Sequence, residues 1–145
     1  MNWYKISQLN NNQTWEKILS EIELKYPKVQ NMVDGRIVRP EIPNTSSIDS
    51  SLENYIVLTG VREVPMSEFD VDGKHWYNSV EGNQKISKLT EEIRNSKEIS
   101  PLIIVVDKEG PYILEGSTRI DALYRLGANS FPALVVVDKE NIDNL

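Results

Sequence analysis

The chain has 145 residues, of which 39% are hydrophobic and 26% are charged, and its formal net charge is −6. These values are typical of one globular domain with its own core, and the acidic balance argues against broad, non-specific binding to nucleic acid. The absence of cysteine excludes disulfides and thiolate chemistry. The sequence shows no secretory signal and no apolar run of roughly 20 residues, so we expect a cytoplasmic protein that does not enter a membrane.

Residues 1–50 are expected to form an N-terminal extension with a strand, an amphipathic helix and a Pro/Ser-rich loop. The alternation in WYKISQL (3–9) predicts the strand. Between 14 and 26 apolar residues recur with helical spacing until Pro27: Trp15, Ile18, Leu19, Ile22 and Tyr26. We expect this face to pack on the core, with the groove of a partner protein as the alternative. Residues 34–51, which are rich in Ser and carry two prolines, are interpreted as an extended linker or surface loop.

Residues 51–145 are expected to form the main domain, in which strands and helices follow one another in a mixed order. The predicted elements are strands at 55–60 and 61–66 with a break at Gly60, a turn at 70–73, a helix at about 84–96, a strand at 101–107, a turn at 107–110, a strand at 111–114, a helix at 118–126 ended by Gly127, and a strand at 131–138. This order predicts an α+β (mixed α/β) fold, in which helices flank a mixed sheet.

The segment LEGSTRIDAL (114–123) joins a predicted strand to a predicted helix and carries candidate phosphate-binding groups. Gly116 lets the backbone approach a ligand, and the N–H groups at a helix start favour an anion. Ser117 and Thr118 add hydroxyl donors, and Arg119 adds a charged fork that suits a phosphate. The four residues from Gly116 to Arg119 would therefore form a phosphate cradle.

A structural interpretation of the same turn stays open. Thr118 followed by Asp121 fits a capping box, which would occupy both side chains at the helix start. Arg119 could pair with Glu115 or with Asp121. Glu115 itself could orient Arg119, hold a metal ion near a phosphate, or act as a base, so that Glu115 and Arg119 are the candidate catalytic residues.

The segment DGKHWYNSVEGNQK (72–85) precedes the predicted second helix and shows no apolar periodicity. It offers aromatic and polar side chains: His75, Trp76, Tyr77, Glu81, Asn83 and Gln84. These side chains could stack on a base and read its edge, or they could anchor a loop onto the core. The single histidine, His75, excludes a metal site made of several histidines and is interpreted as a surface residue.

The stretch ISPLIIVVDKEGPYILEGSTRIDALYRLGANSFPALVVV (99–137) resembles the core of the ParB N-terminal and sulfiredoxin-like superfamily. The shared features are a Pro-Leu-Ile-Val-Val strand, a hairpin, a Gly-x-x-Arg turn that opens a helix with Ala-Leu, and a final Pro-x-x-Val-Val strand. The resemblance covers about residues 55–137. It implies a small mixed-sheet domain whose Gly-x-x-Arg turn, Gly116 to Arg119, binds the phosphates of a nucleotide.

The residues between that glycine and arginine separate this chain from the branches of the superfamily. Ser117 stands where sulfiredoxins carry their reactive cysteine, so that activity is excluded. ParB has Glu-Arg at the two middle positions and free-serine kinases have residues like His-His, whereas this chain has Ser117 and Thr118. The DNA-binding helix-turn-helix that follows the ParB core is not expected within these 145 residues. Glu81, Asn83 and Gln84 lie roughly where relatives place further nucleotide or metal contacts.

The leading hypothesis is therefore a ParB-like domain that binds a nucleotide (ATP, ADP or CTP) with Mg²⁺. NTP hydrolysis and phosphoryl transfer are the reactions that such a site would support. One alternative is a nuclease or DNA-binding module, which would require Lys85, Lys88 and Arg94 to gather on one face. Another is a non-catalytic protein that binds a partner through residues 1–50.

Overall fold

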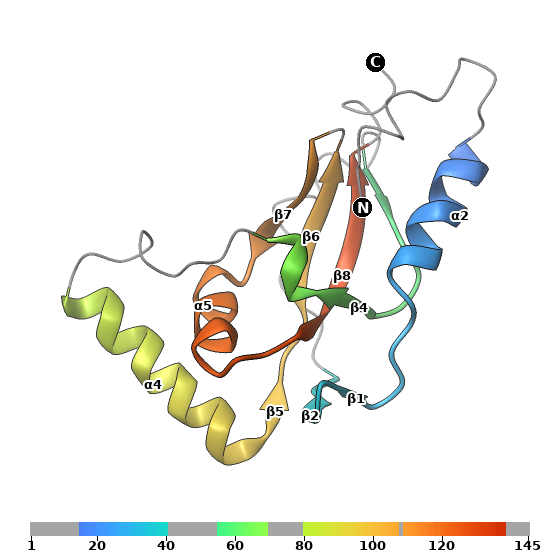
Figure 1. The fold of residues 1–145 in the computed structure, drawn as a ribbon. Helices are drawn as coiled ribbons and strands as arrows, with labels where there is room; N and C mark the ends of the chain where they lie inside the picture. The colour runs from blue at the N-terminus through green and yellow to red at the C-terminus, as the bar shows by residue number, and fades with distance from the viewer. Residues whose placement is uncertain (1–14, 41–54, 70–79, 108, 139–145) are drawn as a thin grey trace.

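The structure is a computed structural model that describes residues 15–40, 55–69, 80–107 and 109–138 of the chain (Figure 1). Its elements, in chain order, are α2 (Trp15–Lys25), β1 (Met32–Val33), β2 (Arg36–Val38), β3 (Tyr55–Val57), β4 (Arg62–Pro65), the 3-10 helix η1 (Met66–Glu68), α4 (Val80–Ser96), β5 (Glu98–Ile99), β6 (Leu102–Asp107), β7 (Gly110–Glu115), α5 (Ser117–Arg125) and β8 (Ser130–Asp138). Helices and mixed sheets occur together, which confirms the predicted α+β class.

The main sheet has five strands in the order β3-β8-β6-β7, and β4 also pairs with β8. The two central strands, β6 and β8, are parallel and aligned from Leu102 opposite Ala133 to Val106 opposite Val137. Strand β7 returns antiparallel along β6, and β3 and β4 run antiparallel to β8. Leu102 through Val106 of β6 are buried, as the uninterrupted apolar run predicts for a central strand.

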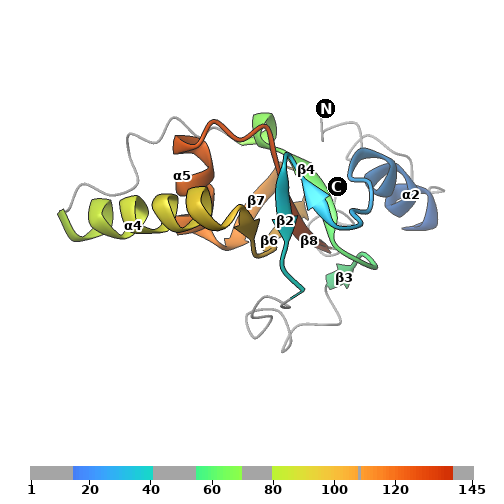
Figure 2. The same cartoon turned by 90° about the horizontal axis from the view of Figure 1, so that it is seen from below.

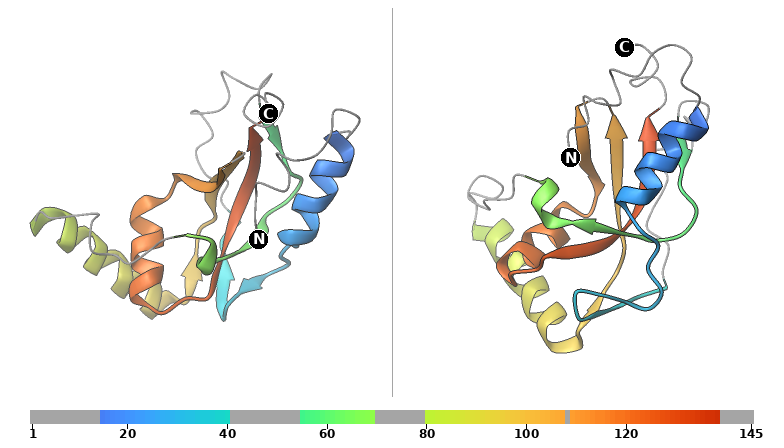
Figure 3. Two further views of the ribbon diagram at one scale, coloured as in Figure 1. Left: turned by 45° about the horizontal axis from the view of Figure 1, so that its top comes forward. Right: turned by 45° about the vertical axis from the view of Figure 1, so that its right-hand side comes forward.

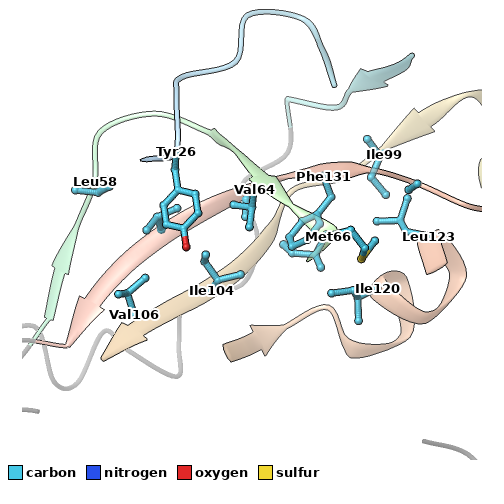
Figure 4. Close-up of a cluster of buried hydrophobic side chains, with 14 of the residues drawn as sticks. Tyr26, Leu58, Val64, Met66, Ile99, Ile104, Val106, Ile120, Leu123 and Phe131 are labelled. Carbon is cyan, nitrogen blue, oxygen red and sulfur yellow. The ribbon is translucent and has the colours of Figure 1, made fainter. Parts of the chain in front are cut away.

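Most of the buried side chains form one cluster, to which α2 contributes Ile18 and Ile22 and α5 contributes Ile120 and Leu123. Figure 4 shows part of this cluster, from Tyr26 to Leu123. Both helices pack on the same face of the sheet, and Figures 1 and 3 show α2 toward the β3 edge and α5 toward the β7 edge. Ile18 is 7% exposed and Ile22 and Tyr26 are fully buried, so the predicted apolar face of the first helix packs on the core and is not open to a partner protein. The main domain and this part of residues 1–50 therefore share one hydrophobic core.

A second, three-stranded sheet corrects the interpretation of residues 34–40 as part of a linker or loop, whereas residues 41–51 of that predicted loop lie outside the described residues. Asp34 and Gly35 both have positive φ, 52° and 77°, and connect β1 to β2 as a hairpin turn. Strand β2 then pairs in parallel with β5, a strand that the sequence pattern did not indicate. The Asp34 carboxylate also accepts a hydrogen bond of 2.8 Å from the backbone N–H of Asn129. Asp-Gly is a common hairpin turn. The prolines and serines that follow it favour a loop, so the composition of the whole segment concealed the hairpin.

Helix α4 begins at Val80, four residues before the predicted start, so Glu81, Asn83 and Gln84 belong to its first turns and not to a preceding loop. The apolar pattern missed this part because the buried position there is Gly82, which carries no side chain. Figure 2 shows α4 packed beside α5. The strand predicted at 3–9, the turn at 70–73 and the residues His75, Trp76 and Tyr77 lie outside the described residues.

No helix in the described part of the chain has the length and apolar character needed to cross a membrane.

Helix α2 is attached to η1 through the nearly buried carboxylate of Glu68. The Tyr26 hydroxyl donates to Oε1 of Glu68 at 2.9 Å, and Nζ of Lys25 lies 2.8 Å from the same oxygen. The side chains of Lys25 and Glu68 are 12% and 9% exposed. Burial, followed by the charge and the hydrogen bond of Glu68, raises the pKa of Tyr26 well above its ordinary value of 10.0.

The raised pKa of Tyr26 predicts a loss of stability in alkali. In the folded protein the phenol resists ionisation, whereas in the unfolded chain it ionises near pH 10, so the contribution of Tyr26 to the free energy of unfolding is complete below about pH 10 and declines above it. Urea unfolding between pH 7 and 11 should show a decline in the wild type that is smaller in Tyr26→Phe. Equal declines in the two proteins would show that other groups cause it.

Candidate functional site

The turn between β7 and α5 requires glycine at position 116. Gly116 has φ 112°, in the left-handed region that side-chain-bearing residues rarely adopt. A Cβ atom placed there would lie 2.6 Å from Cγ of Leu102, which is fully buried in β6. The start of α5 is therefore packed directly against the central sheet, and Gly116 is the residue that allows this close approach.

The predicted capping box is wrong in its register. The N-cap of α5 is Gly116, which has no side chain to cap with, and Thr118 is already the second helical residue. The first helical hydrogen bond runs from the N–H of Ile120 to the carbonyl of Gly116 at 2.9 Å. Asp121 lies inside the helix and is buried, at 3% exposure, and no side-chain hydrogen bond caps the helix start as a capping box would.

Arg119 is held by two neighbouring backbone carbonyls and by one carboxylate. Its Nη1 donates to the carbonyl oxygens of Ser100 and Pro101 at 2.9 and 2.7 Å. Its Nη2 lies 3.9 Å from Oε1 of Glu115, which confirms the predicted pairing of these two residues. Burial lowers the pKa of the Arg119 guanidinium, and Glu115 partly offsets this effect. The side chain is 21% exposed, so it is fixed in place while it still reaches solvent.

A pocket of about 500 Å³ opens beside this turn. It is lined by residues of the β7–α5 turn, of α4 and of the loop before β6: Leu89, Ser100, Pro101, Leu114, Glu115, Gly116, Ser117, Thr118 and Arg119. The structure thus brings Glu115 and the four residues of the predicted cradle to one cavity. The sequence pattern did not single out Leu89, Ser100 and Pro101 for a site, because their proximity to the turn depends on how β6 and α4 pack.

The remaining predicted binding residues lie elsewhere on α4. Glu81, Asn83 and Gln84 are exposed and are not among the described residues that line the pocket. Asn83 accepts a hydrogen bond of 3.1 Å from Nη2 of Arg125. Arg125 is the last residue of α5, so Asn83 lies near the C-terminal end of α5, whereas Gly116 lies at its N-terminal end. A ligand that contacts both groups would have to span the length of α5, about 13 Å.

Basic residues do not form a separate face on α4. Three acidic and three basic residues are interspersed along the helix: Glu81, Lys85, Lys88, Glu91, Glu92 and Arg94. Arg94 is further neutralised by an ion pair with Glu91. The basic face that the DNA-binding alternative requires is therefore not found on this helix.

The described ranges contain no group of three or more His, Asp or Glu residues placed to hold a metal ion. Glu115 is the one carboxylate among the described residues that line the pocket. A Mg²⁺ ion that enters with a nucleotide needs only one or two protein carboxylates, because phosphate oxygens and water complete its coordination. Glu115 fits this limited role.

The chain matches no known family model, and the comparison with curated proteins finds no match either. The resemblance of residues 55–137 to the ParB and sulfiredoxin-like superfamily therefore stays a prediction.

Proposed function

We propose that the chain binds a nucleotide through its phosphate groups, in the pocket beside Gly116, Ser117, Thr118 and Arg119. The observation that carries this proposal is the convergence of a helix start, hydroxyl-bearing residues and a fixed guanidinium on one open cavity. Each of these groups favours an anion.

The backbone supplies the first part of the site. The N–H groups at the start of an α-helix precede its first internal hydrogen bond, and the helix dipole adds partial positive charge there. In α5 these groups belong to the residues that line the pocket, and the N-cap glycine has no side chain that would cover them. A phosphate at this position would thus meet backbone donors.

Arg119 supplies the full positive charge. A guanidinium carries five N–H donors, and the contacts within the described residues involve the Nη1 group and one side of Nη2. The donors that remain can bind phosphate oxygens without disturbing the carbonyl contacts. Those contacts hold the guanidinium in position, so less side-chain entropy would be lost when a ligand binds.

Glu115 would have the supporting role. It pairs with Arg119 and lines the same cavity, so it can orient the guanidinium and contact a Mg²⁺ ion that arrives with the nucleotide. Hydrolysis or phosphoryl transfer at such a site would depend on positioning and charge stabilisation. Glu115 is then the group beside the pocket that could position a water molecule or an acceptor hydroxyl.

The proposal predicts that nucleotides stabilise the protein through Arg119. With ATP, ADP or CTP and Mg²⁺ at about one hundred times Kd, the free energy of unfolding should rise by about 2.7 kcal/mol, or roughly 8 °C in Tm. Arg119→Ala should bind at least about tenfold more weakly, because it removes charge-assisted hydrogen bonds. Titration calorimetry on the folded proteins would measure this loss separately from any change in stability.

Arg125→Ala is the matched control. Arg125 is also a cation on α5, but it contacts Ser87 and Asn83 on α4 and does not line the pocket. Its removal should leave nucleotide affinity unchanged. Absence of any nucleotide-induced shift in the wild type would refute the proposal, and equal losses in the two variants would indicate a general charge effect in place of a site at Arg119.

A further inference from the structure

A smaller cavity, of about 80 Å³, adjoins the pocket beside Gly116. Its lining includes Arg39, which follows β2, together with Glu92 of α4 and Glu98 of β5. Three of the described residues line both cavities: Leu89, Ser100 and Arg119. The two cavities are therefore neighbours that meet at Arg119 and at the residue whose carbonyl holds it.

The pairing of β2 with β5 places the backbone of Arg39 close to Arg119. Val38 lies opposite Ile99 in this parallel pair, and the backbone N–H of Arg39 donates to the carbonyl of Ile99 at 2.9 Å. The next carbonyl along the chain, that of Ser100, accepts the hydrogen bond of 2.9 Å from Nη1 of Arg119. Two consecutive carbonyl groups thus position the two arginines, one by its backbone and the other by its guanidinium.

The side chain of Arg39 is held only by a weak ion pair. It is 48% exposed, and its Nε lies 3.7 Å from Oε2 of Glu98, whose side chain is 42% exposed. A pair of this length between solvent-exposed groups contributes little, whereas a phosphate accepts short, charge-assisted hydrogen bonds from a guanidinium. A phosphate that reaches this cavity can therefore displace Glu98 from Arg39.

We infer that Arg39 is a second phosphate-binding arginine, so that the site prefers a ligand with linked phosphates over a monophosphate. The inference rests on the proposed function, since it adds a contact to the same ligand. One phosphate would lie at the start of α5 against Arg119, and the next in the chain would meet Arg39. The charges of the smaller cavity support this role, because Glu92 and Glu98 also line it and would repel an anion if no cation were present.

Arg39→Ala tests the inference, and Arg94→Ala is its control. Both arginines are about half exposed and pair with a glutamate, but Arg94 lines neither cavity. The probes are ATP, CTP and inorganic tripolyphosphate, each with Mg²⁺, and the monophosphates AMP and CMP, whose affinities are measured by competition. We expect Arg39→Ala to weaken binding of the three triphosphates about tenfold, through lost charge-assisted hydrogen bonds, and to leave the monophosphates unaffected. Arg39→Gln, which keeps a polar side chain without the charge, should show the same loss, and Arg94→Ala should show none.

The possible results separate this inference from the proposed function. If the wild type binds ATP or CTP and both Arg39 variants bind them equally well, the inference is wrong and the phosphate site stands. The same holds if Arg94→Ala loses as much affinity as Arg39→Ala, or if the wild type binds monophosphates as tightly as triphosphates. If neither tripolyphosphate nor any nucleotide binds the wild type, the phosphate site itself is refuted and the inference falls with it.

Discussion

Gly116→Ala is expected to lower the free energy of unfolding by about 3 kcal/mol, from backbone strain at positive φ and from overpacking, which corresponds to roughly 10 °C in Tm. The new methyl group would lie 2.6 Å from Cγ of Leu102, and Leu102 has no exposed surface toward which it could move. The start of α5 would have to shift, so phosphate binding should weaken as well. Thermal unfolding and titration with a nucleotide would measure the two effects.

Gly127→Ala isolates the steric part of this effect. Gly127 follows α5 and also has a positive φ, 71°, but no atom lies within 4 Å of the position that its Cβ would occupy. We expect a loss of only about 1 kcal/mol, from backbone strain alone, and unchanged nucleotide affinity. If the two alanine variants lost the same stability, the contact between Gly116 and Leu102 would not be the constraint that we describe.

Arg62→Ala is expected to cost about 3 kcal/mol of stability, because it removes hydrogen bonds from a buried charged donor. Arg62 is 4% exposed. Its Nε and Nη2 donate to the carbonyl of Thr59 at 3.2 and 2.9 Å, and its Nη1 donates to the carbonyl of Tyr26 at 3.2 Å. Nη2 also lies 3.6 Å from Oε1 of Glu23. One side chain thus joins the end of α2 to the β3–β4 connection.

Arg94→Ala is the corresponding control, and urea unfolding is the measurement. Arg94 pairs with Glu91 on the exposed surface of α4, where an ion pair contributes less than about 1 kcal/mol. We expect a clear loss for Arg62→Ala and almost none for Arg94→Ala. Similar midpoints for the two variants would contradict the assignment of Arg62 as the buried link between α2 and the sheet.

The candidate site was predictable in its local part. A glycine between a strand and a helix, followed by two hydroxyl-bearing residues and an arginine, is visible in the sequence, and the structure places Gly116 to Arg119 on one pocket. The carbonyl partners of Arg119 were not predictable, since Ser100 and Pro101 are 19 and 18 residues away in the chain.

In the fold, too, the features that depend on neighbouring residues were predictable and those that depend on distant residues were not. Helix α2 and strands β6 and β8 follow from periodicity and apolar runs, because these patterns depend on neighbouring residues. The pairing of β2 with β5, the burial of Arg62 and the pocket beside Gly116 were decided by the tertiary structure. The physical reason is that secondary-structure preference is a local property, whereas a cavity or a buried ion contact exists only when chain segments remote in sequence are packed together.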